Sequence, residues 1–129
     1  MLGNPVGAVE THFADPGILS ALEAADAAAV DRMPFGVIRM DHAGVVTAYN
    51  AYESTASGLS PERVVGRPFF SAVGPCMDNP LVGGRFEAEA ELDEIIPYVF
   101  SFGVRPATVR LRLLKSGSFH HRYLLVERR

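Results

Sequence analysis

The sequence is poor in several residues whose abundance marks whole classes of protein. Its 129 residues include one cysteine, one lysine and no tryptophan. The lone Cys76 cannot form an internal disulfide, which is typical of a reducing compartment and leaves a free thiol to be explained. With a net charge of -3 and no basic run, the chain lacks the pattern that binds nucleic-acid backbones.

The sequence also shows neither the pattern of a secretory leader nor that of a membrane span. The N-terminus has no basic region followed by an apolar stretch, and no apolar run approaches the roughly 20 residues that cross a bilayer. We therefore expect a cytoplasmic protein with no membrane partner, present as a monomer or a weak dimer. A hydrophobic content of 48% over this length is enough for one domain with one core and a ligand-sized pocket.

The common catalytic motifs are absent as well. The sequence has no Gly-x-Ser-x-Gly, Gly-x-x-x-x-Gly-Lys, Gly-x-Gly-x-x-Gly or His-Glu-x-x-His. No histidine falls between residues 43 and 119, and the adjacent His120 and His121 would point to opposite faces of a strand. We expect neither an enzyme nor a metal site.

Periodicity and turn residues predict a series of short elements. Asp15 followed by Pro16 is typical of a helix start, and the apolar spacing continues that helix to about Val30. Residues 50–57, a segment that opens at Ser60, and residues 81–92 are the further helices expected. Alternating patterns predict strands at 35–40, 45–49, 98–104, 108–114 and 121–126.

This order of elements predicts an α+β fold rather than alternating βαβ units. We expect a single five-stranded antiparallel sheet, with short helices on one face and an N-terminal helical cap. A pocket between the sheet and the helices follows from that arrangement.

Two features of the sequence could carry chemistry. Tyr49, Glu53 and Ser57 are four residues apart, so a helix that Tyr49 enters would place all three on one face with their polar ends in reach of one another. From spacing alone, three polar residues in this pattern more commonly form a solvated helix face. A lone cysteine is likewise usually a small buried hydrophobe. Cys76, however, follows Gly74-Pro75 in a rigid loop from which its sulfur could face the same cavity.

The sequence resembles the photoactive yellow protein family, blue-light sensors of the PAS fold whose cysteine holds p-coumaric acid as a thioester. The resemblance covers nearly the whole chain, and its specificity comes from Tyr49, Glu53 and Cys76 occurring together at the family's spacing. The other matching residues are Phe13, Pro34-Phe35-Gly36, Asp41, Gly44, Asn50-Ala51, Val65-Gly66, Phe69-Phe70, Pro75, Gly84-Arg85-Phe86, Tyr98, Phe100 and Arg128.

The resemblance implies a cap segment at residues 1–34, a PAS core at 35–129, and covalent p-coumaric acid on Cys76. Tyr49 and a protonated Glu53 would hydrogen-bond the phenolate of this chromophore, because a lone charge in an apolar interior needs donors aimed at it. Light would then move a proton from Glu53, and the buried carboxylate would loosen the cap for an unidentified signalling partner. The residues implied to bind the chromophore are Tyr49, Glu53, Ser57, Phe69, Tyr98 and Phe100.

Four departures from the family pattern bear on these expectations. Leu59 stands where many members have an arginine over the chromophore, and Val104 replaces a methionine that speeds thermal return to the dark state. Tyr52 takes the place of a small residue, and the stretch from Phe86 to Tyr98 is about three residues shorter than in the family.

Two other functions fit the residues. The chain could be a PAS module that binds a different small ligand or uses Cys76 as a redox thiol, or an interaction domain without a chromophore. A flavin-binding light sensor is less favoured, because its cysteine lies in an Asn-Cys-Arg type of helix motif whereas Cys76 follows Gly-Pro.

Overall fold

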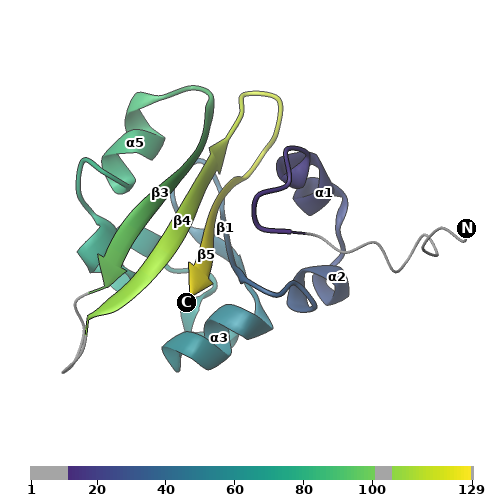
Figure 1. Cartoon of the computed structure of the whole chain (residues 1–129), viewed down its shortest axis with the longest axis vertical. Coiled ribbons are helices and arrows are strands. Elements are labelled where there is room, and N and C mark those ends of the chain that lie inside the picture. Colours follow the sequence, from purple (N-terminus) through teal and green to yellow (C-terminus); the bar gives the residue numbers. More distant parts are fainter. Residues whose placement is uncertain (1–11, 101–105, 129) are drawn as a thin grey trace, which may run out of the picture.

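The computed structural model describes residues 12–100 and 106–128, so the predicted strand beyond Phe100, Val104 included, lies outside the described residues. One antiparallel sheet forms the centre of the fold, with strand order β2-β1-β5-β4-β3 (Figure 1). Its strands are β1 (Gly36–Met40), β2 (Val46–Tyr49), β3 (Leu92–Phe100), β4 (Ala107–Lys115) and β5 (Arg122–Arg128). The predicted α+β class and five-stranded sheet are confirmed.

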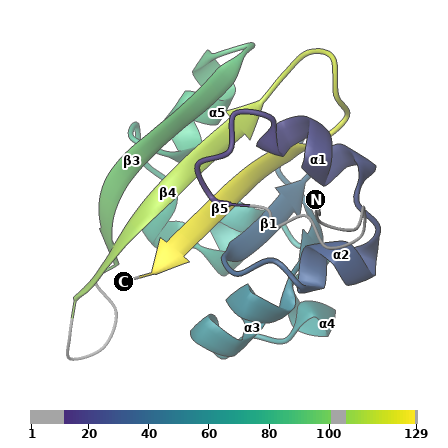
Figure 2. The same ribbon diagram turned by 45° about the vertical axis from the view of Figure 1, so that its right-hand side comes forward.

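Short helices cover one face of this sheet. They are α3 (Ala51–Ser57), α4 (Pro61–Val64), the π-helical segment η2 (Phe69–Val73), the 3-10 turn η3 (Pro75–Met77) and α5 (Gly83–Ala88). On the other face lie the N-terminal helices α1 (Ile18–Ala24) and α2 (Ala27–Asp31) (Figure 2). Two apolar clusters result, one on each side of the sheet, which is why all of the first five residues of β5 are buried.

The hairpin of β1 and β2 follows directly from its sequence. Gly44 adopts a φ of +85° in the turn, a conformation that favours glycine over any residue with a side chain. Asp41 supports the turn, because its carboxylate accepts hydrogen bonds from the backbone N–H groups of Ala43 and Val45, each at 2.9 Å.

The long first helix expected from Asp15 to Val30 is wrong. Asp15 instead accepts a hydrogen bond from the His12 backbone at 3.1 Å, and α1 begins at Ile18. The helix stops at Ala25, whose backbone is extended, and the Asp26 carboxylate then caps α2 by accepting from Ala29 N at 2.8 Å. An aspartate can end one helix and start the next because its side chain competes for backbone donors.

The helix expected over 81–92 is also too long, and the strand expected from Tyr98 starts too late. Helix α5 ends at Ala88, and β3 already begins at Leu92. Pro97 lies inside this strand, where it is tolerated because β3 is at the edge of the sheet.

Buried polar contacts hold the N-terminal segment on the sheet. Arg112, 4% exposed, donates to the backbone carbonyls of Phe13 at 2.9 Å and Asp15 at 2.7 Å, and pairs with both oxygens of Asp93. Glu23 of α1 accepts from the Tyr123 hydroxyl at 2.5 Å and contacts His121 Nδ1 at 2.8 Å. Burial opposes ionisation of Glu23, but these hydrogen bonds and the charge of His121 outweigh it and lower the pKa of Glu23.

Replacement of Arg112 by methionine tests this anchor. The variant keeps an apolar side chain of similar length but leaves two backbone carbonyls and Asp93 without their donor, so we expect a loss of about 2–4 kcal/mol in the free energy of unfolding. The matched control is Arg110→Met on the same strand β4. It breaks a more exposed ion pair with Glu127 of β5 and a contact of the guanidinium with the Phe13 ring, but no buried hydrogen bond to the N-terminal segment, and should cost about 1 kcal/mol or less. Denaturant unfolding measures both, and equal losses would contradict the anchoring role.

Candidate functional site

The amide of Asn50 fixes the start of the helix that carries the candidate site. Asn50 is 1% exposed, and its Oδ1 accepts from the backbone N–H of Val37 at 2.9 Å and of Glu53 at 3.1 Å. Its Nδ2 donates to the carbonyls of Val30 and Phe35, each at 3.0 Å. One side chain thereby joins α2, β1 and α3, and acts as the N-cap of α3.

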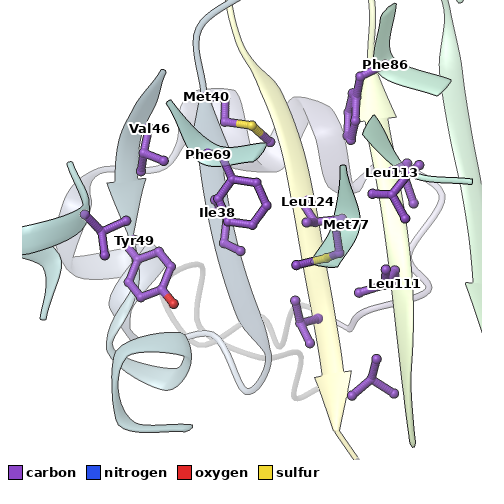
Figure 3. Packing of buried hydrophobic residues seen from close by; sticks show 14 of the residues in the cluster. Ile38, Met40, Val46, Tyr49, Phe69, Met77, Phe86, Leu111, Leu113 and Leu124 are labelled. Carbon is purple, nitrogen blue, oxygen red and sulfur yellow. The ribbon is translucent and has the colours of Figure 1, made fainter. Parts of the chain in front are cut away.

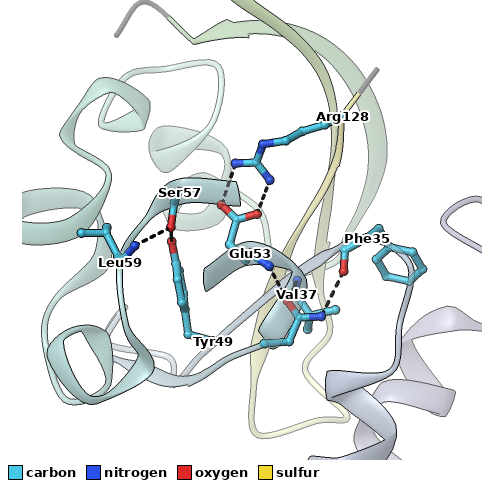
Figure 4. Close-up of polar contacts among 8 residues, drawn as sticks. Phe35, Val37, Tyr49, Glu53, Ser57, Leu59 and Arg128 are labelled. Carbon is cyan, nitrogen blue, oxygen red and sulfur yellow. Dashed lines mark hydrogen bonds and ion pairs between the residues drawn. The ribbon is translucent and has the colours of Figure 1, made fainter. Parts of the chain in front are cut away.

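Glu53 is buried and paired with Arg128 (Figure 4). Arg128 Nη1 donates to Oε1 at 2.6 Å and Nη2 donates to Oε2 at 3.0 Å, the two-pronged geometry of a guanidinium on a carboxylate. Burial opposes the charge on Arg128, but the hydrogen bonds and charge of Glu53 raise its pKa above the ordinary value. Both carboxylate oxygens of Glu53 are thus bound by Arg128, whereas the resemblance implies a Glu53 that hydrogen-bonds a chromophore.

Gly36 of β1 leaves the space that the Glu53 carboxylate occupies. A Cβ at Gly36 would lie 2.1 Å from Glu53 Oε1 and 3.2 Å from the Cβ of Val126. The carboxylate therefore packs directly against the backbone of a central strand, and only glycine permits that approach.

The Tyr49 hydroxyl is hydrogen-bonded to Ser57 and not to Glu53. Tyr49 is the last residue of β2 rather than part of α3, and its hydroxyl donates to Ser57 Oγ at 2.8 Å (Figure 4). Ser57 Oγ also accepts from the backbone N–H of Leu59 at 3.2 Å. Burial raises the pKa of Tyr49, and the charge of Glu53 raises it further. The predicted grouping thus separates into a Tyr49–Ser57 pair and a Glu53–Arg128 pair within electrostatic range of each other.

An apolar cluster extends from Tyr49 along the helix-covered face of the sheet (Figure 3). Phe69 and Phe100, which the resemblance predicts as wall residues of the chromophore site, are 2% and 3% exposed members of it, and Tyr98 packs against its edge. The ring of Phe100 lies edge-on to Tyr98 at 5.9 Å and beneath the Arg128 guanidinium at 5.9 Å. Met77, the residue after Cys76, belongs to the same cluster.

Cys76 lies in the turn η3, and its backbone carbonyl is hydrogen-bonded to a side chain of β3. The Tyr98 hydroxyl donates to the Cys76 carbonyl at 2.8 Å, and Asn79 Nδ2 donates to the same carbonyl at 3.1 Å. Cys76 is an exposed residue with a free thiol, and partial burial of its sulfur raises the pKa of that thiol. In the described part of the chain no three His, Cys, Asp or Glu side chains are placed to hold a metal.

Sequence reasoning missed the roles of Asn50, Asn79 and Arg128. Asparagine directly before a helix is a frequent N-cap, so the position of Asn50 was a usable signal. No local signal marks Arg128 as the partner of Glu53, because 75 residues separate them. Of the departures, Leu59 is 37% exposed, and Tyr52 lines a surface groove beside Met33.

Curated proteins resemble this chain over most of its length. The photoactive yellow protein of Rhodothalassium salexigens is 32% identical over 119 residues, which cover 90% of this chain and 95% of the relative. That of Halochromatium salexigens is 32% identical over 108 residues, covering 81% and 86%. No protein-family model matches the sequence.

Solved structures agree with these relatives. The photoactive yellow protein domain of the sensor histidine kinase Ppr from Rhodospirillum centenum superposes with a TM-score of 0.76 at 35% identity, covering 84% of this chain and 98% of that domain. The PAS domain of an HTR-like protein from Haloarcula marismortui superposes with a TM-score of 0.59 at 18% identity, covering 86% and 96%. At that identity the second likeness shows the PAS fold alone.

The contact between Gly36 and Glu53 predicts a specific mutational coupling. Gly36→Ala should lower the free energy of unfolding by about 1–3 kcal/mol, because the new methyl group must displace the Glu53 carboxylate from Arg128. In a Glu53→Ala background the same substitution should cost less than half as much. A double-mutant cycle in denaturant measures the difference, and strictly additive costs would rule out the contact.

Proposed function

The chain belongs to the photoactive yellow protein family of PAS photoreceptors, and we propose that it senses blue light through p-coumaric acid held as a thioester on Cys76. The observation that carries the proposal is the place of this thiol. Cys76 is the only cysteine of the chain, and its loop is fixed to the edge of the apolar cluster that ends at Tyr49.

The types of side chain present suit a phenolic group attached as a thioester. Cys76 directly precedes Met77 of the cluster, Tyr49 belongs to the same cluster, and its apolar members include Phe69 and Phe100. When bound, the group supplies a conjugated chain that absorbs blue light and isomerises. Tyr49 and Glu53 would hold its phenolic oxygen, and both must turn from their present partners, Ser57 and Arg128, to do so.

The raised pKa of the Cys76 thiol bears on how the site would be loaded. A thiol whose pKa is raised carries less thiolate at neutral pH, which slows its reactions as a nucleophile, acylation and disulfide exchange alike. Acylation then requires a donor that is already activated, such as a coenzyme A ester or an anhydride. The stable product of that acylation would be a thioester on the only thiol of the chain.

Helix α3 connects the proposed site to the N-terminal helices. Glu53 is three residues after Asn50, whose amide donates to the carbonyl of Val30 in α2. The carboxylate of Asp31 accepts a hydrogen bond from the first residue of α3, Ala51, at 2.9 Å. A change in the charge or the partner of Glu53 would act on α3, and these hydrogen bonds would pass it from α3 to the cap segment.

The output of the sensor is proposed to be a change in contact between the cap segment and a downstream signalling protein. The related domain from Rhodospirillum centenum is part of a sensor histidine kinase, which supports a role in signal transduction. No helix in residues 12–100 and 106–128 is long and apolar enough to span a membrane.

Replacement of Cys76 tests the attachment. After treatment with activated p-coumaric acid, the native chain should gain the mass of one acyl group and a visible absorption band, whereas Cys76→Ala should gain neither. Tyr98→Phe is the matched control, because it keeps the thiol and loses only a hydroxyl, which donates to the Cys76 carbonyl and accepts from Asn79 Nδ2 at 2.7 Å. Intact mass and absorbance measure the result, and equal covalent loading of Cys76→Ala would overturn the assignment.

A second substitution tests the proposed donor. Tyr49→Phe removes a hydrogen bond to the phenolate, so the pH at which half of the visible band is lost on acidification should rise by about 1–2 units. Ser57→Ala, which keeps the Tyr49 hydroxyl and removes only its present acceptor, should shift this midpoint less. An unchanged midpoint in Tyr49→Phe would show that this hydroxyl does not contact the chromophore.

A further inference from the structure

The pairing of Glu53 with Arg128 raises the question of which charge balances a phenolate in this protein. The Glu53 residue is 4% exposed, and both of its carboxylate oxygens are bound by Arg128. A carboxylate so deeply buried is stable only with such a partner, because an unpaired charge in the interior is costly.

Arg128 is placed to remain at the site when Glu53 turns away. Its guanidinium lies over the ring of Phe100, 5.9 Å from the ring centre, and Phe100 is one of the predicted wall residues. The aromatic face gives the cation a second contact that does not depend on Glu53. Its charge also acts on Tyr49, where it opposes the rise in pKa caused by burial and by Glu53.

The position that holds a lid arginine in many relatives carries Leu59 in this chain. Leu59 is 37% exposed and contributes only backbone hydrogen bonds to α3 and its end, with Ser54 and Ser57. A buried phenolate still needs a compensating charge, and Arg128 is a cation that already contacts Glu53, one of the two groups assigned to hold it, and whose charge acts on the other, Tyr49.

We propose that Arg128 is the counter-ion of the pigment site, holding Glu53 ionised before the chromophore binds and balancing the phenolate afterwards. This inference rests on the proposed function. Its proton balance closes within the site: the phenol O–H bond breaks, an O–H bond forms at a carboxylate oxygen of Glu53, and Arg128 keeps its charge throughout. The net charge of the three groups is therefore zero before and after the transfer.

The first test uses the protein without chromophore. An infrared difference spectrum between the native chain and Glu53→Gln should show the band of a carboxylate at neutral pH. In an Arg128→Gln background the same difference should show the carbonyl band of a protonated acid, because a buried glutamate without its cation becomes neutral. Arg110→Gln, a like change of charge on the neighbouring strand β4, should leave the carboxylate band in place.

The second test uses the loaded protein. Acid loss of the visible band should move to higher pH by about 1–3 units in Arg128→Gln, as expected when an opposite charge near an ionised group is removed. Arg128→Lys keeps the charge without the two-pronged geometry and should recover most of that shift. Arg110→Gln should show no shift.

The outcomes separate this inference from the function on which it rests. Normal loading of Arg128→Gln with an unshifted midpoint, or an unchanged carboxylate band in its chromophore-free form, would overturn the counter-ion role alone. A native chain that takes up no activated p-coumaric acid would overturn the photoreceptor proposal and the counter-ion role together.

Discussion

The buried amide of Asn50 is the interaction on which the arrangement of the whole chain depends. It satisfies backbone groups of three segments at once, the end of the cap at Val30, the start of β1 at Phe35 and Val37, and the first turn of α3 at Glu53. A buried backbone group left without a partner costs about 1–3 kcal/mol, although the Val30 carbonyl also accepts from the backbone N–H of Met33 at 3.2 Å. The amide therefore determines where the cap ends, where β1 begins and where α3 starts.

Strand β1, which the Asn50 amide holds at its start, is packed on both faces of the sheet. β1 lies between β2 and β5, and its Gly36 packs against the Glu53 carboxylate on the helix-covered side. On the cap side, Val37 lies in the cluster with Ile18 and Leu22 of α1. A strand held in this way has little freedom to shift, because close-packed interiors transmit displacements rather than absorb them. A displacement at Glu53 would therefore press on a strand whose other face packs against α1.

How much could be predicted from the sequence depended on how local the cause was. The hairpin at Gly44 and the strands β4 and β5 were predictable, because alternation and one glycine determine them. The break at Ala25 was not, because the side chain of Asp26 competed successfully with a continuous helical pattern. The resemblance named Glu53 as a residue of the chromophore site, and that assignment stays a prediction. The ion pair of Glu53 with Arg128 arises from tertiary packing, which no spacing along the chain encodes.

Both partners of the Glu53–Arg128 pair belong to elements that also touch the cap. Helix α3 reaches it through Asn50 and Ala51, and β5 reaches it through Tyr123, which donates to Glu23 of α1. Separation of Glu53 from Arg128 would therefore act on two separate attachments of the N-terminal segment, one through α3 and one through β5. The attachment made by Arg112 to Phe13 and Asp15 involves neither element, so it would hold the start of the segment while α1 and α2 loosened. The described part of the N-terminal segment is therefore tied to the sheet through three elements, α3, β5 and β4, and a change confined to the Glu53–Arg128 pair would leave the attachment to β4 in place.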